Sequence, residues 1–186
     1  MKKITFIIIC SIVLGGCIKD MTKASPVEIL QNTKSGGSEF DTDDYTTLPP
    51  LHSQLNRGLI SSLDRLEFML AVKKNKTDGR LKKGLLVKIN YTEPNWRFYE
   101  SASFKGGEQA DFNSVNRTVL NCVAYKTLGT RCDYSEIMSI TLTDSFIENN
   151  KNGFSVRLNS QAPENNVITI PENYMAAFME LLKQQM

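Results

Sequence analysis

Apolar and polar residues alternate along much of the chain, and this alternation predicts a β-rich domain. In residues 66–72, and again in residues 85–91, every second side chain is a large apolar one, which is typical of strands with one buried face. The turn signal Asp78-Gly79 lies between the two runs. Two alternating runs around Asp-Gly predict an antiparallel hairpin with a long basic tip.

Further strands are expected toward the C-terminus. We predict them at residues 96–104, 117–125, 134–143, 154–158 and 166–170. Asp144 is a suitable N-cap for a short helix that ends before Gly153. Pro171 is expected to open a final helix, because proline is tolerated at the first helical position. The face of that helix toward the sheet would consist of Tyr174, Phe178, Leu181, Leu182 and Gln185.

Together these elements predict an α+β fold. The strands would form an antiparallel meander of about six or seven strands, as a sandwich or a partly open barrel, with the C-terminal helix packed on the sheet. Leucines at positions 51, 55, 59, 63 and 66 recur at helical spacing, so we expect a short amphipathic helix before the first strand. Residues 51–186 are assigned to one globular domain.

Residues 17–50 have a different composition and are expected to form a flexible tether. They are rich in Ser, Thr, Gly, Asp and Pro and contain few residues that build a core. Asp41, Asp43 and Asp44 resemble a calcium loop only superficially, since the glycine at the sixth position and the closing glutamate are missing. We interpret the three aspartates as part of a solvated linker.

The first residues have the features of an export signal. Lys2 and Lys3 precede the uncharged and mostly apolar run from residue 4 to residue 14. A helix that spans a membrane needs about 20 apolar residues, so this run is too short. A positive start, a short apolar stretch and small residues at its end are typical of a secretory signal.

Leu14-Gly15-Gly16-Cys17 resembles the lipobox of bacterial lipoproteins at every position. The resemblance implies a signal peptide of residues 1–16, cleavage between Gly16 and Cys17, and lipidation of the Cys17 thiol and amino group. Two or more acyl chains anchor a protein stably, whereas one does so only marginally. The alternative is an ordinary secretory signal followed by a chance cysteine.

The residue after the lipidated cysteine influences the location of lipoproteins in Gram-negative bacteria. An aspartate there favours the inner membrane, and this chain has Ile18, so the resemblance implies the outer membrane, facing the periplasm. A Gram-positive source would place the protein on the outer face of its single membrane. The stretch from WRFYESASF to ITIPENYMAAFMELL also resembles small uncharacterised lipoproteins of proteobacteria, and this likeness implies no activity.

Two cysteines remain after Cys10 is removed with the signal and Cys17 is lipidated. Cys122 and Cys132 are expected to form a disulfide, because thiols outside the cytoplasm most simply pair; two free thiols are the alternative. His52 is the single histidine and there is no second cysteine pair. We therefore expect neither a metal site nor another cofactor.

Charge and motif content argue against several functional classes. Without residues 1–16, which contain two lysines and no acids, the chain has 20 basic and 20 acidic residues. A nucleic-acid-binding protein would show a basic surplus, so no such partner is expected. Signatures of serine hydrolases, zinc proteases, P-loop proteins and dinucleotide-binding proteins are missing.

Two glutamates are weak catalytic candidates. Glu136 alternates in phase with the apolar residues of its strand, and Glu100 is in phase with Phe98 and Phe104. Two inward carboxylates are what glycoside hydrolysis requires, one as acid and one as base or nucleophile, and peptidoglycan would be a substrate at this location. The alternative is that each acid forms an ion pair with an arginine, for which Arg97, Arg117 and Arg131 are available.

The basic tip of the first hairpin is a candidate surface for anionic head groups or a phosphate-bearing envelope polymer. Its cations are Lys73, Lys74, Lys76, Arg80, Lys82 and Lys83. A hairpin tip that simply faces water is the alternative, because runs of charge are usually solvated.

The function expected from these features is that of a non-enzymatic lipoprotein. It would be anchored in the membrane by lipid, and its domain would bind another envelope component, in the first place a protein. One alternative is a carrier or sensor with a small apolar ligand between the sheet and the final helix. The other is a cell-wall glycan hydrolase that uses Glu100 and Glu136.

Overall fold

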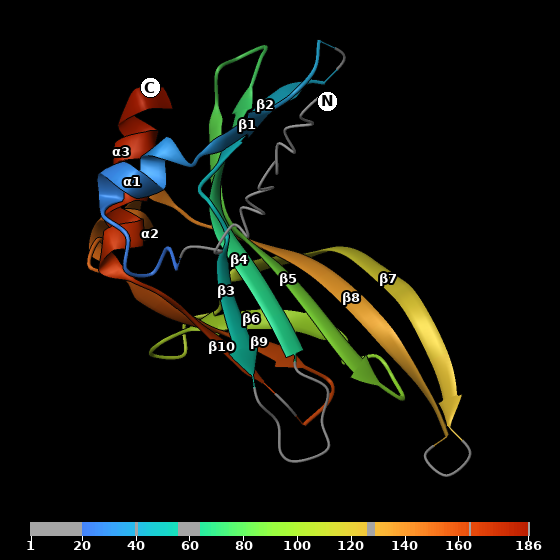
Figure 1. Ribbon diagram of the computed structural model, residues 1–186. Coiled ribbons are helices and arrows are strands. Elements are labelled where there is room, and N and C mark those ends of the chain that lie inside the picture. The colour runs from blue at the N-terminus through green and yellow to red at the C-terminus, as the bar shows by residue number, and fades with distance from the viewer. Residues whose placement is uncertain (1–19, 40, 56–63, 126–128, 164, 186) are drawn as a thin grey trace, which may run out of the picture.

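The computed structural model describes residues 20–39, 41–55, 64–125, 129–163 and 165–185. These residues form ten strands and three helices (Figure 1). The strands belong to two antiparallel sheets that share one hydrophobic core with the C-terminal helix. The predicted α+β class, with a C-terminal helix packed on antiparallel strands, is therefore confirmed. The predicted lipobox and Cys17 lie outside the described residues.

The larger sheet has seven strands and is open at both edges. Its strands are β1 (Lys34–Gly36), β2 (Asp43–Thr47), β3 (Leu51–Leu55), β4 (Asp64–Asn75), β5 (Leu81–Glu93), β7 (Asp111–Tyr125) and β8 (Gly129–Thr141). They are hydrogen-bonded in the order β1-β2-β4-β5-β8-β7, and β3 also pairs with β4. Because β1 and β7 end the order, the sheet does not close into a barrel.

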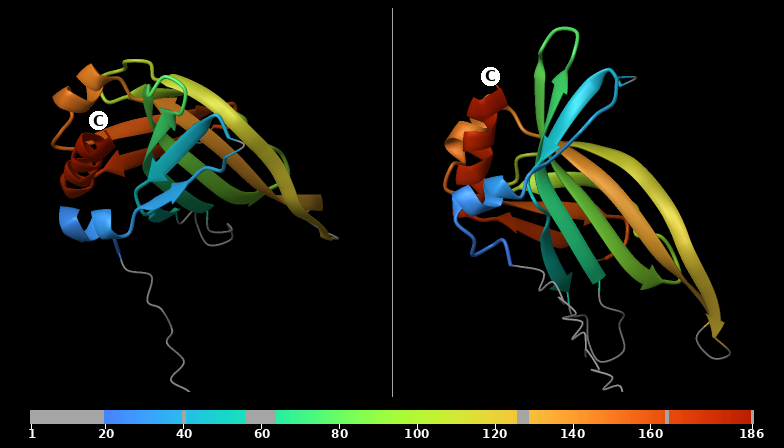
Figure 2. Two further views of the ribbon diagram at one scale, coloured as in Figure 1. Left: turned by 90° about the horizontal axis from the view of Figure 1, so that it is seen from above. Right: turned by 45° about the horizontal axis from the view of Figure 1, so that its top comes forward.

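The smaller sheet lies against one face of the larger sheet, which we call the inner face (Figures 1 and 2). It contains β6 (Tyr99–Phe104), β9 (Phe154–Ser160) and β10 (Asn166–Ile170), in the order β10-β9-β6. Buried side chains alternate along β4, β5, β8, β9 and β10, as the period of two predicts. The opposite face of the larger sheet is called the outer face.

The three helices lie together at one end of the sheets (Figure 1). They are α1 (Pro26–Gln31), α2 (Asp144–Asn149) and α3 (Glu172–Gln185). The Oγ of Ser25 accepts a hydrogen bond from an amide in the first turn of α1, and the Oγ1 of Thr143 does the same for α2. The N-cap of α2 is thus Thr143 and not the expected Asp144.

Helix α3 fills the space at this end of the core. Its buried residues are Tyr174, Met175, Ala177, Phe178, Leu181 and Leu182. The hydroxyl of Tyr174 donates to the carbonyl oxygen of Pro49 at 2.7 Å, which ties α3 to the chain before β3. The backbone at Gly153 passes close to that of Ile170, just before α3. Only glycine fits there, because φ is +98° and a Cβ would lie 2.5 Å from the carbonyl oxygen of Ile170. None of the helices in the described part of the chain is long and apolar enough to span a membrane.

Most of the expected tether is instead part of the domain. The described residues from Pro26 to Thr47 contain α1, β1 and β2, and β2 pairs with β4. The reason is that two large side chains in this segment, Ile29 and Leu48, are fully buried in the core. The expectation of a tether throughout residues 17–50 was therefore wrong for this part. A few apolar residues are enough to hold a polar segment on the domain when the rest of the domain covers them.

The leucines at positions 51 to 66 also form strands where they are described, and not the expected helix. Leu51 is opposite Phe68 in the pairing of β3 with β4, and Leu66 lies within β4. Residues 56–63, which include Leu59 and Leu63, lie outside the described residues. Leu51 and Leu66 are buried, so tertiary burial in the sheet overrides the helical spacing.

The expected disulfide is confirmed. The sulfur atoms of Cys122 on β7 and Cys132 on β8 lie 2.00 Å apart. The two residues are direct partners in the antiparallel pairing of these strands. The bond therefore joins the two strands near the far end of their hairpin.

We expect Ile29→Ala to lower the free energy of unfolding by about 2–5 kcal/mol, because it removes buried methyl groups from the core. Val27→Ala in the same helix is a matched control, since Val27 is 65% exposed, and should change stability by less than about 0.5 kcal/mol. Urea denaturation of both variants tests this. Equal stability of the Ile29 variant and the native chain would mean that α1 is not part of the folded domain.

Candidate functional site

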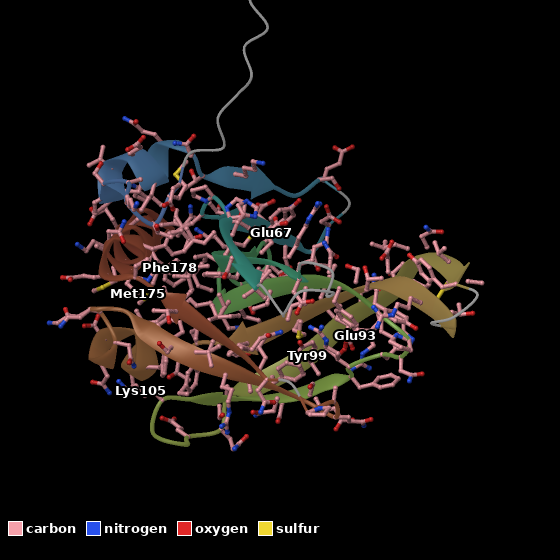
Figure 3. The ribbon with its side chains drawn as sticks, turned by 60° about the horizontal axis from the view of Figure 1, so that its bottom comes forward. Glu67, Glu93, Tyr99, Lys105, Met175 and Phe178 are labelled. Carbon is pink, nitrogen blue, oxygen red and sulfur yellow. A yellow bond between two sulfur atoms is a disulfide. The ribbon has the colours of Figure 1, made fainter. Side chains whose placement is uncertain are left out.

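Charged side chains are buried between the two sheets, at the end of the core away from α3. Figure 3 shows two of the residues involved, Glu93 and Tyr99, far from Met175 and Phe178 of α3. At the centre lies Arg97, whose side chain is 1% exposed. Its Nη1 and Nη2 donate to the two carboxylate oxygens of Asp64 at 2.7 and 3.0 Å. This bidentate geometry is the strong form of an arginine–carboxylate pair.

Arg97 has further partners that satisfy the rest of its guanidinium group. Its Nε donates to Oε1 of Glu93 at 2.9 Å, and its charged carbon lies 4.2 Å from the centre of the Tyr91 ring. Burial alone would lower the pKa of Arg97, but the hydrogen bonds to Asp64 and Glu93 outweigh it and raise the pKa. Arg97 is therefore a permanent buried cation held by two carboxylates and an aromatic face.

Glu136 points into the core, as expected from its phase in β8, and it is 1% exposed. Its Oε1 accepts a hydrogen bond from the Tyr91 hydroxyl at 2.6 Å. Its Oε2 accepts from Nε of Arg117 at 2.9 Å and from the amide of Tyr99 at 3.2 Å. The alternative in which an arginine meets this acid is thus confirmed for Glu136, and the arginine is Arg117.

These contacts join the two sheets, so we call the group the buried charged seam: Asp64, Tyr91, Glu93, Arg97, Tyr99, Arg117 and Glu136. Glu93 and Arg117 form its edge, where their side chains are 26% and 32% exposed. Tyr99 belongs to β6 of the smaller sheet, and Arg117 also donates to its carbonyl oxygen at 2.9 Å. The Tyr99 hydroxyl accepts a hydrogen bond from Nδ2 of Asn166 on β10 at 2.5 Å. Both carboxylate oxygens of Glu136 are occupied inside the protein, which is the arrangement of a structural ion pair.

Glu100 does not lie beside Glu136 on the inner face, which corrects its predicted orientation. The pairing of β6 with β9 shifts register between Tyr99 and Ser101, and Phe98 has φ +51°. The irregularity turns Tyr99 inward and leaves Glu100 exposed, where it accepts a hydrogen bond from the side chain of Gln161. Two carboxylates facing one substrate, as glycoside hydrolysis requires, are therefore not present at these positions.

The third candidate arginine, Arg131, lies on β8 near the disulfide and pairs with neither glutamate. Its Nε is buried and has no hydrogen-bond partner among the described residues. His52 lies exposed on β3, opposite Glu67 of β4. In the part of the chain that the structure describes, no group of three or more His, Cys, Asp or Glu side chains is placed to hold a metal ion.

The basic hairpin tip is largely neutralised, which changes its interpretation. Lys73 and Lys76 form ion pairs with Asp43 and Asp44 of β2, at 2.7 and 3.2 Å. Arg80 pairs with Asp78 at 2.5 Å, and Lys83 pairs with Asp144. The three aspartates first considered as a linker thus lie beside or within β2, and two of them offset the charge of the hairpin.

The outer face of the larger sheet carries a hollow of about 460 Å³, which we call the outer-face hollow. It spans β2, β4, β5, β8 and β7. Its described lining includes Tyr45, Thr47, Ala71, Lys73, Lys82, Gly84, Leu86, Val115, Ser139 and Thr141. The hollow exists because its central residues are small: Ala71 is paired with Gly84, and Gly84 with Thr141.

A β-bulge directs Val115 toward this hollow. The pairing of β7 with β8 shifts register between Ser114 and Asn116, so Val115 is the extra residue. A bulge redirects a side chain that regular alternation would place on the other face. A second bulge, at Leu120, contributes to another hollow of about 460 Å³ that is also lined by Arg65, Asn90 and Asp133.

Beyond the second bulge, β7 and β8 extend past the smaller sheet (Figures 1 and 2). We define the β7–β8 arm as residues 119–125 and 129–133, which carry the disulfide. Four large apolar side chains on the arm are exposed: Val119, Leu120, Val123 and Tyr125. Since β7 ends the larger sheet, the arm exposes apolar side chains and a strand edge together.

A smaller hollow lies where the expected apolar-ligand site was placed. It has a volume of about 320 Å³ and is lined by the start of β5, α2 and the last turns of α3, with Leu81, Ile147 and Met179 among its residues. Elsewhere, the surface of α3 toward the sheets consists of buried side chains. A small ligand between the sheet and the final helix stays a prediction.

The comparisons with known proteins add no family. No protein-family model matches the chain, and neither a curated protein nor a solved structure matches it significantly. The candidate surfaces therefore rest on geometry alone. Small residues at alternating positions of β4, β5 and β8 were a signal for the outer-face hollow that sequence reasoning missed, whereas no local pattern identified the partners of Arg97.

Arg97→Met should lower the free energy of unfolding by about 3–5 kcal/mol, because it removes the bidentate partner of the buried Asp64 carboxylate. Arg157→Met is the matched control: Arg157 is exposed and bonds only to Asn159 among the contacts described, and its loss should cost less than about 0.5 kcal/mol. Chemical denaturation of both variants provides the measurement. Similar losses in the two variants would contradict the stabilising role of the seam.

Stability should also fall as the pH rises above about 10, where the tyrosines of the unfolded chain ionise. Burial and the Glu136 carboxylate raise the pKa of Tyr91, so its hydroxyl stays protonated in the folded chain. A raised folded-state pKa gives stability that is complete below the unfolded pKa and lost above it.

Tyr91→Phe should therefore lose about 1–3 kcal/mol near neutral pH, because Glu136 loses a donor, and should then decline less steeply between pH 9 and 11. Urea midpoints across this range test both effects. A decline as steep as that of the native chain would show that Tyr91 does not contribute to the alkaline loss.

Proposed function

We propose that the chain is a lipid-anchored protein of the bacterial envelope whose domain binds another envelope protein and catalyses no reaction. Cys17 supplies the anchor in this proposal, on the strength of the lipobox resemblance. Ile18 after it favours the outer membrane, with the domain facing the periplasm. The disulfide between Cys122 and Cys132 supports an oxidising compartment.

The observation that carries the proposal is the β7–β8 arm. Val119, Leu120, Val123 and Tyr125 are between 45% and 60% exposed, although they are residue types that folding normally covers. The charged side chains among the described residues of the arm are Arg131 and Asp133. An apolar, charge-poor centre with an aromatic side chain is the composition of a protein interface core.

The interior of the domain supports a binding role over a catalytic one. The strongest acid candidate, Glu136, has both oxygens engaged by Tyr91, Tyr99 and Arg117. The other candidate, Glu100, is exposed on β6, whereas Glu136 is buried in the core. The domain thus presents surfaces for docking, while its buried charges hold the two sheets together.

Site-specific photo-crosslinking in intact cells tests the proposal. A photoreactive residue at Val123 should give one dominant protein adduct, whereas the same residue at Val167 on β10, which is 58% exposed, should give none. Leu120→Asp, on the same arm, should reduce the Val123 adduct by at least about tenfold, because it places a charge in the contact. The captured protein, once purified, should bind the native chain and not the Leu120 variant.

The anchor is tested in the same cells with a chain that carries Cys17→Ala behind a cleavable secretory signal. If the arm and the anchor act together, the adduct at Val123 should fall when the domain is released from the membrane. Adducts of equal strength at Val123 and Val167, or an adduct unchanged by Leu120→Asp, would contradict docking on the arm.

A further inference from the structure

The outer-face hollow carries cations above a floor of small side chains. Lys73 and Lys82 are direct partners in the antiparallel pairing of β4 with β5, so their side chains lie on the same face. Like charges directly opposite each other destabilise a sheet. Lys73 pairs with Asp43, but Lys82 has no ion-pair partner among the described residues.

The rest of the hollow is mainly apolar. Leu86 and Val115 line it from two strands, and Tyr45, which is exposed, lines it from β2. Along the outer face, Ala71 and Gly84 leave the centre open because they have little or no side chain. Sites for small molecules have volumes of about 300–1,000 Å³ and combine apolar surface with a few polar groups, and this hollow has both properties.

We propose that the outer-face hollow binds a fatty acid, with the acyl chain over Ala71 and Gly84 and the carboxylate beside Lys82. The acyl chain would cover the apolar side chains of Leu86 and Val115, which the bulge in β7 brings to the hollow. The carboxylate would be the missing partner of Lys82, whereas Lys73 already has its partner in Asp43. This site lies apart from the β7–β8 arm, so either proposal can fail without the other.

Isothermal titration calorimetry with dodecanoate tests the site. The protein is the chain without residues 1–16 and with Cys17→Ala, which retains every described residue and cannot be acylated. Dodecanoate should bind at one site per chain. Dodecanol, which lacks the charge, should bind about fivefold more weakly, the effect of one exposed ion pair. Inorganic phosphate, which lacks the chain, should give no measurable heat.

Two kinds of variant separate the contributions of volume and charge. Ala71→Leu fills the centre of the hollow and should weaken dodecanoate binding by at least about tenfold. Lys82→Gln should weaken it about fivefold. Lys88→Gln is the matched control, because Lys88 lies on the same strand and face but does not line the hollow; its affinity should stay within about twofold of the native value.

Ser139→Leu is a second space-filling variant, on β8, in case Ala71→Leu disturbs folding, and unfolding midpoints check both. The proposal is overturned if dodecanoate does not bind, or if binding is unchanged in both space-filling variants. Equal affinity for dodecanol overturns it as well, because the charge of Lys82 would then have no role. Lysine-dependent binding to phosphatidylglycerol vesicles without dodecanoate binding would identify a membrane surface as the ligand instead.

Discussion

The ion pair between Arg97 and Asp64 holds the start of the smaller sheet against the larger one, because Arg97 lies just before β6 and Asp64 begins β4. Both side chains are at most 2% exposed, so removal of either one would leave a buried charge with weaker compensation. Around them, Tyr91 and Glu136 continue the network to Tyr99 of β6. Apolar packing alone tolerates small shifts between layers, whereas a bidentate pair and its neighbours specify one relative position of the sheets.

The seam lies on the inner face of the larger sheet, so the outer face takes no part in the contact between the two sheets. The smaller sheet and the helices cover the inner face, and the polar network closes that core at the end away from α3 (Figure 3). The outer face and the far part of β7 receive no cover from the described residues. A two-stranded ribbon of this kind is only marginally stable in water. The disulfide between Cys122 and Cys132 stabilises it by joining the two strands covalently.

The sequence predicted the parts of the fold that depend on local periodicity. Alternation identified the strands around Leu66, Val87 and Met138, and the final helix was recognised from Pro171 and the apolar spacing after it. Buried residues follow these patterns in β4, β5, β8 and α3. The disulfide followed from the compartment and from the small number of cysteines, and it also needed no knowledge of the fold.

Features that depend on distant residues could not be predicted in the same way. Ile29 and Leu48 look isolated in a polar segment, and only the assembled core shows that they are buried. Alternation predicted that Glu100 points inward like Glu136, but the irregularity after Phe98 turns its side chain outward. An arginine was expected to meet Glu136, yet the choice of Arg117 depends on the pairing of β7 with β8. The outer-face hollow likewise requires the strand order.

The central claim is that the β7–β8 arm is a docking surface that is covered in the cell. Hydrogen–deuterium exchange of the lipidated protein, in envelope membranes and after purification, tests this most directly. Amides of residues 119–125 should exchange more slowly in the membranes, while those of β10 and α2 exchange at the same rate in both. Equal exchange of residues 119–125 in the two preparations would contradict the account.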